Sequence, residues 1–192
     1  YKLSRLLRGQ RGTEGAMGNP APAGVRVVML DADIAPLSIA STDVGIAWNW
    51  MIGPASEDLT DVSYAQVAFT PKGIGLRPYA VAHVSQPWRF ASTPGDLTIS
   101  WKRRTRAVAG DSWDSIEVPL FEDMESYEID ILNGATVKRT LTASTASVLY
   151  TGAQQIADWG ALLVPGNSLQ VAIYQLSAQF GRGARKLETL FF

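Results

Sequence analysis

Short segments that alternate apolar and polar residues recur along the chain, and they limit its fold more than any other feature. Clear examples are residues 97–102, 127–132 and 169–173, in which apolar side chains recur at every second position. Gly, Pro, Asp and Asn residues separate these segments. A period of two places the apolar residues on one face of a strand, as in an antiparallel sheet that covers a single core. Because a sustained helical period is missing almost everywhere, the sequence predicts an all-β fold.

Turn-forming sequences connect several of the predicted strands. Asn133-Gly134 lies between the strands predicted at 127–132 and 136–141. Asn-Gly is a strong hairpin signal because both residues tolerate a positive φ. Gly181-Arg182-Gly183 predicts a similar turn just before a last strand at 185–191.

The chain divides into two predicted domains. Residues 71–75 are rich in Pro and Gly and form the best boundary. We expect residues 1–75 to form an incomplete, less regular β-rich domain and residues 76–192 to form a small β-sandwich. Strands are predicted in the first domain at 25–30, 44–51 and 64–69. The chain begins at Tyr1 without an initiator Met, and we expect it to be part of a longer polypeptide.

The order of strands after residue 76 resembles a fibronectin type III domain, with an inward-facing Trp101 on its second strand. The resemblance implies the first, second, third, sixth and last strands of that fold at 78–87, 97–102, 127–132, 169–177 and 185–191. The sequence departs from the family in three places. An inserted loop occupies 105–124, Leu169 stands where the family usually has the Tyr of the tyrosine corner, and residues 154–159 predict a short helical turn.

Several longer sequence motifs resemble those of a second protein family. They include Arg-Thr-Arg at 104–106 with Gly-Asp-Ser-Trp at 110–113, and Tyr-Gln-Leu-Ser at 174–177 with Gly-Arg-Gly at 181–183. In this order and spacing they resemble the C-terminal region of the tail-tip proteins (host-specificity or baseplate hub proteins) of gene transfer agents and long-tailed phages. The resemblance implies a hub-type domain at 1–75 followed by a fibronectin type III-like domain at 76–192.

The same resemblance implies a function. We expect a structural component of a phage-like tail tip or baseplate that contributes to assembly and to host-envelope contact. The expected partners are other tail or baseplate proteins, copies of the chain in a homotrimer, and host envelope glycan. The expected location is the tail tip of a virion or gene transfer agent particle, which is extracellular when released.

Residues that carry enzyme chemistry are sparse. His83 is the only histidine and the chain has no cysteine, which excludes a multi-histidine metal site, a thiolate site and a cysteine nucleophile. No triad pattern accompanies His83, which we expect to have a structural or surface role. We predict no catalytic, cofactor-binding or metal-binding residue and therefore no enzyme. The net charge of −1 gives no general attraction to nucleic acid, and no apolar run is long enough to span a membrane.

Two charged runs border the inserted loop. The acidic run contains Glu122, Asp123, Glu125, Glu128 and Asp130. It lacks the spacing of a calcium-binding loop, and we expect Glu128 and Asp130 to line the solvent face of a strand. The basic run is Lys102-Arg103-Arg104 with Arg106. We expect it to be a solvated strand end that the acidic run neutralises, in preference to a site for a phosphate-rich partner.

Six tryptophans are many for 192 residues. Trp101 is a core residue by its pattern, and Trp48 and Trp50 point to one face of a predicted strand. Aromatic side chains anchor subunit interfaces and also stack on sugar rings. We therefore take Trp48, Trp50 and Trp113 as candidate interface or glycan-contact aromatics. The alternative function is a carbohydrate-binding accessory module of a larger envelope- or cell-wall-active enzyme.

Overall fold

A computed structural model describes residue 17 and residues 21–27, 37–85, 95–106 and 118–192. The chain forms two compact units. One contains Asn19–Ile74, and the other contains Gly75–Phe192 with the start of the chain. No helix in the described part of the chain is long and apolar enough to cross a membrane.

The unit of Asn19–Ile74 contains a two-stranded antiparallel ribbon. Its strands are β1 (Trp48–Ile52) and β2 (Ala65–Phe69), preceded by the 3-10 turn η3 (Ser41–Asp43) and followed by η4 (Ile74–Leu76). The strand predicted at 25–30 is wrong over 25–27, which follow a turn and pair with no strand among the described residues. Residues 28–30 lie outside the described residues.

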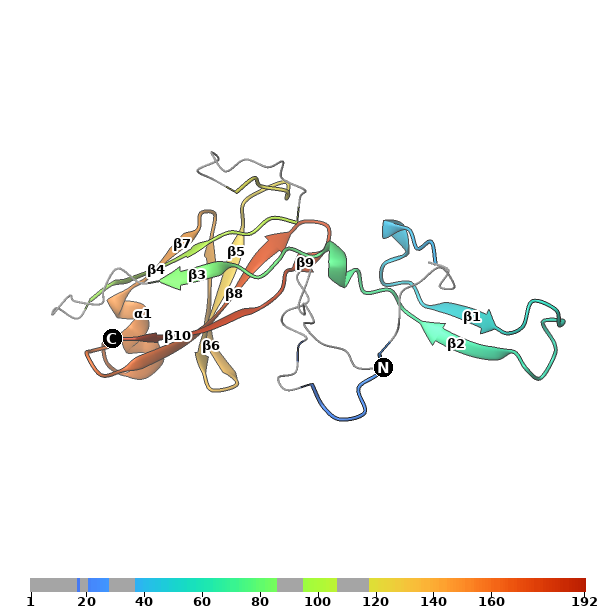
Figure 1. Ribbon diagram of the computed structural model, residues 1–192. Helices are drawn as coiled ribbons and strands as arrows, with labels where there is room; N and C mark the ends of the chain where they lie inside the picture. The colour runs from blue at the N-terminus through green and yellow to red at the C-terminus, as the bar shows by residue number, and fades with distance from the viewer. Residues whose placement is uncertain (1–16, 18–20, 28–36, 86–94, 107–117) are drawn as a thin grey trace. The chain divides into compact units, whose positions relative to one another are not determined.

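The second unit is a β-sandwich with one short helix (Figure 1). One sheet has the order β10-β8-β5-β6 with β9 beside β8, and the other has the order β3-β4-β7. All pairings are antiparallel. The elements are β3 (Ala82–Ser85), β4 (Leu97–Lys102), β5 (Tyr127–Asn133), β6 (Thr136–Ala143), β7 (Ser147–Tyr150), α1 (Gly152–Trp159), β8 (Ser168–Ser177), β9 (Gly181–Arg182) and β10 (Lys186–Phe191).

This architecture confirms the predicted all-β fold with a fibronectin type III-like sandwich. The predicted second, third, sixth and last strands correspond to β4, β5, β8 and β10. The first begins later than predicted, at Ala82 of β3, and residues 86–87 of the predicted range lie outside the described residues. The hairpin at Asn133-Gly134 also forms, but its turn residues are Gly134 and Ala135 because Asn133 still pairs with Thr136. Only Gly134 has a positive φ, which matches a turn with Gly at its first central position.

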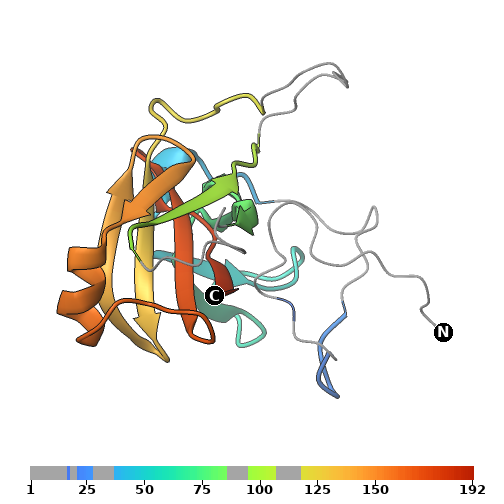
Figure 2. The same cartoon turned by 90° about the vertical axis from the view of Figure 1, so that its left-hand side faces the viewer.

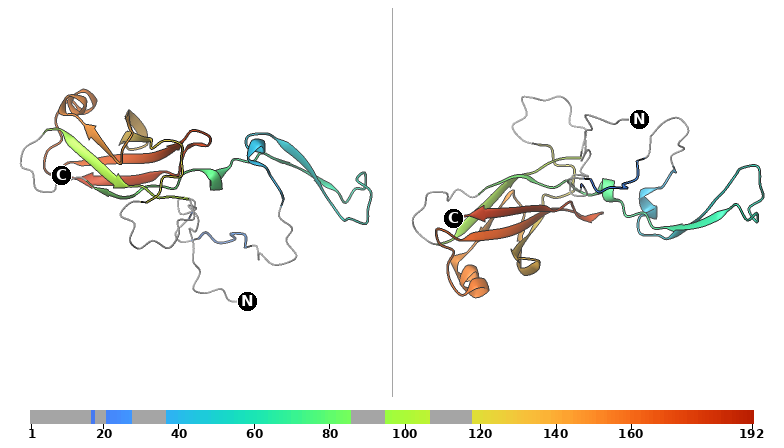
Figure 3. Two further views of the ribbon diagram at one scale, coloured as in Figure 1. Left: turned by 90° about the horizontal axis from the view of Figure 1, so that it is seen from above. Right: turned by 60° about the horizontal axis from the view of Figure 1, so that its bottom comes forward.

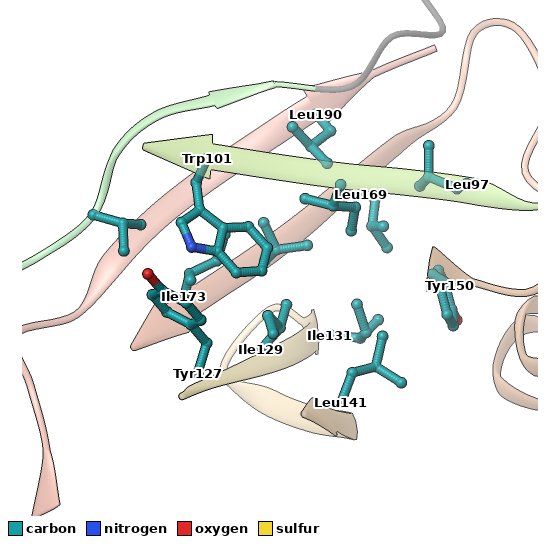
Figure 4. Close-up of a cluster of buried hydrophobic side chains, with 13 residues drawn as sticks. Leu97, Trp101, Tyr127, Ile129, Ile131, Leu141, Tyr150, Leu169, Ile173 and Leu190 are labelled. Atoms are coloured by element: carbon teal, nitrogen blue, oxygen red, sulfur yellow. The ribbon is translucent and has the colours of Figure 1, made fainter. Parts of the chain in front are cut away.

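The core lies between the two sheets and is built from the alternating apolar residues (Figure 4). Trp101 of β4 packs edge-on against Tyr127 of β5, with 5.0 Å between ring centroids. The predicted core position of Trp101 is therefore confirmed, since the residue is 3% exposed. Leu169, which replaces the tyrosine-corner residue, is also buried. Full burial of one such side chain stabilises the fold by about 1.5–3 kcal/mol.

Helix α1 forms where the short helical turn was predicted, and it packs beside β6 and β7 (Figures 2 and 3). Thr151 and Gln154 form a capping box at its start, and Gly160 ends it in the left-handed conformation. The side chain of buried Gln155 donates to the carbonyl groups of Gly95 and Tyr150. These bonds fix the helix to the end of the sandwich.

A polar network joins α1 to β6 and β7. Arg139 donates two hydrogen bonds to Asp158, at 2.7 and 2.8 Å. The buried Tyr150 hydroxyl donates to Asp158 at 2.8 Å and accepts from the indole of Trp159 at 2.9 Å. The hydrogen bond from Arg139 is the main cause of a lowered pKa at Asp158, and burial raises the pKa of Tyr150.

Asp158→Asn tests this network. A carboxyl group with a lowered pKa in the folded state stabilises the fold when it is ionised. Its contribution is present above the ordinary value of 3.8 and is lost as pH falls through the lower folded value. We expect the substitution to reduce the free energy of unfolding by about 1–3 kcal/mol near neutral pH, and the difference from wild type to shrink in acid.

Urea denaturation over a pH series measures this difference. Asp123→Asn is the control, since Asp123 is exposed and belongs to no ion pair among the described residues. A difference between wild type and Asp158→Asn that stays constant into strong acid would contradict the role of the ionised carboxylate.

Gly183 occupies a site without room for a side chain. A Cβ at this position would lie 2.6 Å from the carbonyl oxygen of Pro78 and 2.9 Å from that of Gln175. The adjacent backbone binds the same two carbonyls, with Gly183 N–H donating to Gln175 and Ala184 N–H donating to Pro78. The predicted turn at Gly181-Arg182-Gly183 is therefore wrong, since the turn lies at 178–180 and Gly181–Arg182 form β9. Gly183 instead attaches the segment that precedes β3.

We expect Gly183→Ala to destabilise the sandwich by about 1–3 kcal/mol, because backbone on two sides must move. Gly95→Ala is the matched control, since a Cβ at Gly95 meets nothing within 4 Å. Thermal or urea denaturation of the two variants measures the difference. Equal stabilities for the two variants would show that the close approach at Gly183 is not a constraint.

Candidate functional site

One face of the β1–β2 ribbon consists of apolar side chains. The register pairs Trp48 with Phe69, Trp50 with Val67, and Ile52 with Ala65. Because side chains alternate between the two faces of a strand, these six residues share one face, and Asn49, Met51, Gln66 and Ala68 share the other. We call the first set the apolar ribbon face. It confirms that Trp48 and Trp50 share a face.

The apolar ribbon face is largely open to solvent. Trp48 is 43% exposed, Phe69 49% and Ile52 59%. Trp50 is half-buried, and its covered indole N–H has no hydrogen-bond acceptor among the described residues. Buried donors without an acceptor are rare in complete protein structures.

The ribbon has only two strands in the described part of the chain, and most large side chains on this face are exposed. In the described residues, β1 and β2 pair only with each other. A two-stranded hairpin is at best marginally stable in water, and it gains stability when its apolar face packs on another element. The contiguous row of large apolar side chains is therefore suited to a partner surface.

The loop that joins β1 to β2 is ordered by Tyr64. A Cβ on Gly53 would lie 2.5 Å from the Tyr64 ring, so the ring lies directly on the glycine. The Tyr64 hydroxyl donates to the carbonyl of Pro54 at 2.9 Å. The backbone N–H of Thr60 donates to the carboxylate of Asp58, and that of Ser63 donates to Asp61. These hydrogen bonds lower the pKa of both carboxyl groups.

We expect Gly53→Ala to displace the Tyr64 ring and loosen the loop, because the ring and the new methyl group cannot occupy the same space. The expected result is faster amide hydrogen exchange across β1 and β2, with exchange in β5 and β8 unchanged. If the ribbon amides exchange at the wild-type rate, the contact of Tyr64 with Gly53 does not hold the ribbon.

The three candidate aromatics are only partly brought together. Trp48 and Trp50 have ring centroids 6.2 Å apart and planes tilted by 36°. Trp113 lies outside the described residues. Val67 and Phe69 were not among the predicted site residues, although the apolar period of two at 65–69 contains the signal.

The charged runs beside the inserted loop form ion pairs. Arg103 binds Glu125 and Arg106 binds Glu122, both at 2.9 Å. The predicted neutralisation of the basic run by the acidic run is confirmed. The prediction of a solvated strand end is wrong for Arg103 and Arg106, whose side chains are 16% and 13% exposed.

Asp130 is also not a solvent-facing residue. It is buried, and it accepts hydrogen bonds from Arg182 at 2.9 and 3.2 Å and from Thr140 at 2.6 Å. Arg182 also pairs with Glu128 and lies over the ring of Tyr174. These polar side chains cover the outer face of the sheet at β5, which corrects the expectation that Glu128 and Asp130 line an open face.

His83 is an exposed residue of β3, in agreement with the surface role predicted for it. Its φ of +50° is the only positive value among the described non-glycine residues. Between the pairs Ala82–Lys102 and Ser85–Ser100, β3 has two residues where β4 has one, so His83 lies in a β-bulge. No group of three or more metal-ligating side chains occurs in the described ranges.

Comparison with known proteins adds little beyond the fold class. No protein-family model matches the chain, and no curated protein matches it. Among solved structures, the chain is similar to domains d3–d4 of the rat CD45 extracellular region, at 9% identity and a TM-score of 0.39. This match covers 88% of the chain and 76% of the CD45 structure.

Two further structures are similar over smaller parts of the chain. A fibronectin type III domain of human KIAA0970 gives 12% identity and a TM-score of 0.39, over 62% of this chain and 77% of that domain. The spore cortex lytic enzyme SleM of Clostridium perfringens gives 11% identity and a TM-score of 0.36, over 69% of this chain and 36% of the enzyme. At such scores these likenesses carry no argument about function, and the fold rests on the sheet order and core described above.

Proposed function

We propose that this chain is a non-enzymatic structural component of a phage-like tail tip or baseplate, and that it assembles through the apolar ribbon face. In the proposed assembly three copies of the chain bring their ribbons together, and the apolar faces cover one another. The sandwich is a positioning module that contributes to contact with other tail proteins and with the host envelope. The proposed location is the tail tip of a virion or gene transfer agent particle.

The observation that carries the proposal is the row of paired apolar side chains on an otherwise uncovered ribbon. Trp48 opposite Phe69 and Trp50 opposite Val67 present aromatic and branched side chains together. Aromatic residues are enriched in the buried centres of protein interfaces. Copies of the same chain supply a matching apolar surface by symmetry, because each copy brings the same face to a shared axis.

The geometry favours protein packing over the alternative of glycan binding. A flat sugar platform needs coplanar exposed rings, whereas the Trp48 and Trp50 planes are inclined by 36°. The neighbours of these rings on the same face are aliphatic or aromatic, and the two indole N–H groups are the only polar side-chain groups that this face offers to a sugar hydroxyl group. Such a surface gains most from contact with another apolar surface.

Sedimentation of the full chain tests the proposal. We expect wild type to form a trimer with increasing concentration, and the double variant Trp48→Ser with Phe69→Ser to remain monomeric, because its face loses two large apolar groups. Met51→Ser is the matched control, since Met51 is 47% exposed on the opposite face of the same ribbon.

Circular dichroism separates a loss of assembly from a loss of folding, since the sandwich contains neither substituted residue. A wild-type chain that remains monomeric at every concentration would contradict self-assembly through the ribbon. Loss of the trimer in Met51→Ser to the same degree as in the double variant would contradict the assignment to one face.

A further inference from the structure

A basic groove lies at one edge of the sandwich, where β3 and the start of β10 are neighbours. Its volume is about 500 Å³, and four cationic or protonatable side chains line it: His83, Arg104, Arg185 and Lys186. Its lining also includes the small side chains of Ala80, Ala82 and Ala184. Binding sites for small molecules have volumes of about 300–1,000 Å³.

The concentration of positive charge here is local. The whole chain has a net charge of −1, and no acidic side chain is among the described residues that line the groove. Elsewhere in the sandwich Arg139 and Arg182 are held by carboxylates. Arg185 has no carboxylate partner in the described part of the chain.

The backbone places these side chains from three separate segments. Arg104 follows β4, and its guanidinium lies 5.4 Å from the ring centre of Tyr79, which precedes β3. Lys186 begins β10 and also contacts Glu188 at 3.0 Å. His83 projects from the bulge in β3 with its left-handed backbone. Bulges redirect side chains beside binding sites, and strained backbone is concentrated at functional positions.

We propose that this groove binds a phosphate-bearing ligand of the size of a phosphorylated sugar. Guanidinium groups match the geometry of phosphate oxygens and bind them through paired, charge-assisted hydrogen bonds. Arg185 and Lys186 supply more positive charge than the carboxylate of Glu188 balances, and a phosphate monoester carries close to two negative charges. The proposal does not depend on the ribbon or on assembly.

Calorimetric titration of the full chain tests the groove with three probes: glucose 6-phosphate, inorganic phosphate and glucose. We expect glucose 6-phosphate to bind, glucose to show no binding, and the affinity to fall as salt is added. The double variant Arg185→Gln with Lys186→Gln should weaken binding by about tenfold or more, because two charged donors are removed.

The matched control is Lys138→Gln, which removes a charge from β6 at the opposite edge of the same sheet and should bind as wild type does. Equal affinity for inorganic phosphate and glucose 6-phosphate would support the site and assign the binding to phosphate alone. Three results would overturn the proposal: no binding of either phosphate probe, equal binding of glucose, or equal weakening in Lys138→Gln. An unchanged melting temperature of the double variant shows that its loss of binding is not a loss of folding.

Discussion

A β-sheet with one apolar face needs a second layer to cover that face, and this requirement governs both units of the chain. In the sandwich each sheet covers the apolar face of the other, and Trp101, Tyr127 and Ile173 fill the space between them. In the ribbon the requirement is not met within its own sheet, since β1 and β2 pair only with each other among the described residues. The proposed assembly follows from this difference.

Polar interactions cover the sandwich where no further strand or sheet does, at the edge strands β6 and β7 and on the outer face of β5. At β6 and β7 the network of Arg139, Tyr150 and Asp158 attaches α1. At β5 the buried Asp130 is held by Arg182. Each charge that leaves water here gains an opposite charge or several hydrogen bonds, which offsets most of the cost of burial. The basic groove differs because the described residues of its lining include no carboxylate.

Much of the fold could be predicted from local patterns. Alternation identified β4, β5 and β8, and the position of Trp101 in the core followed from the same period. The pairing of Arg103 with Glu125 was predictable because opposite charges border one inserted loop. The burial of Asp130 was not predictable in this way, because Arg182 lies 52 residues away and only the folded sheet brings them together.

The candidate site likewise has one part that local patterns predict and one part that depends on the folded structure. The shared face of Trp48 and Trp50 follows from a period of two within one strand. Its extension to Val67 and Phe69 depends on the register between β1 and β2, which no local pattern specifies because a shift by one residue would present the opposite face. The basic groove joins side chains from three distant segments, so it became visible only in the folded sandwich.

In the proposed assembly other copies of the chain cover the apolar ribbon face. Amide hydrogen exchange of 48–52 and 65–69, measured over a series of protein concentrations, detects this cover. We expect protection of these amides to rise with concentration, while protection of the β5 and β8 amides is high and constant. Ribbon protection that does not change with concentration would contradict the proposed assembly.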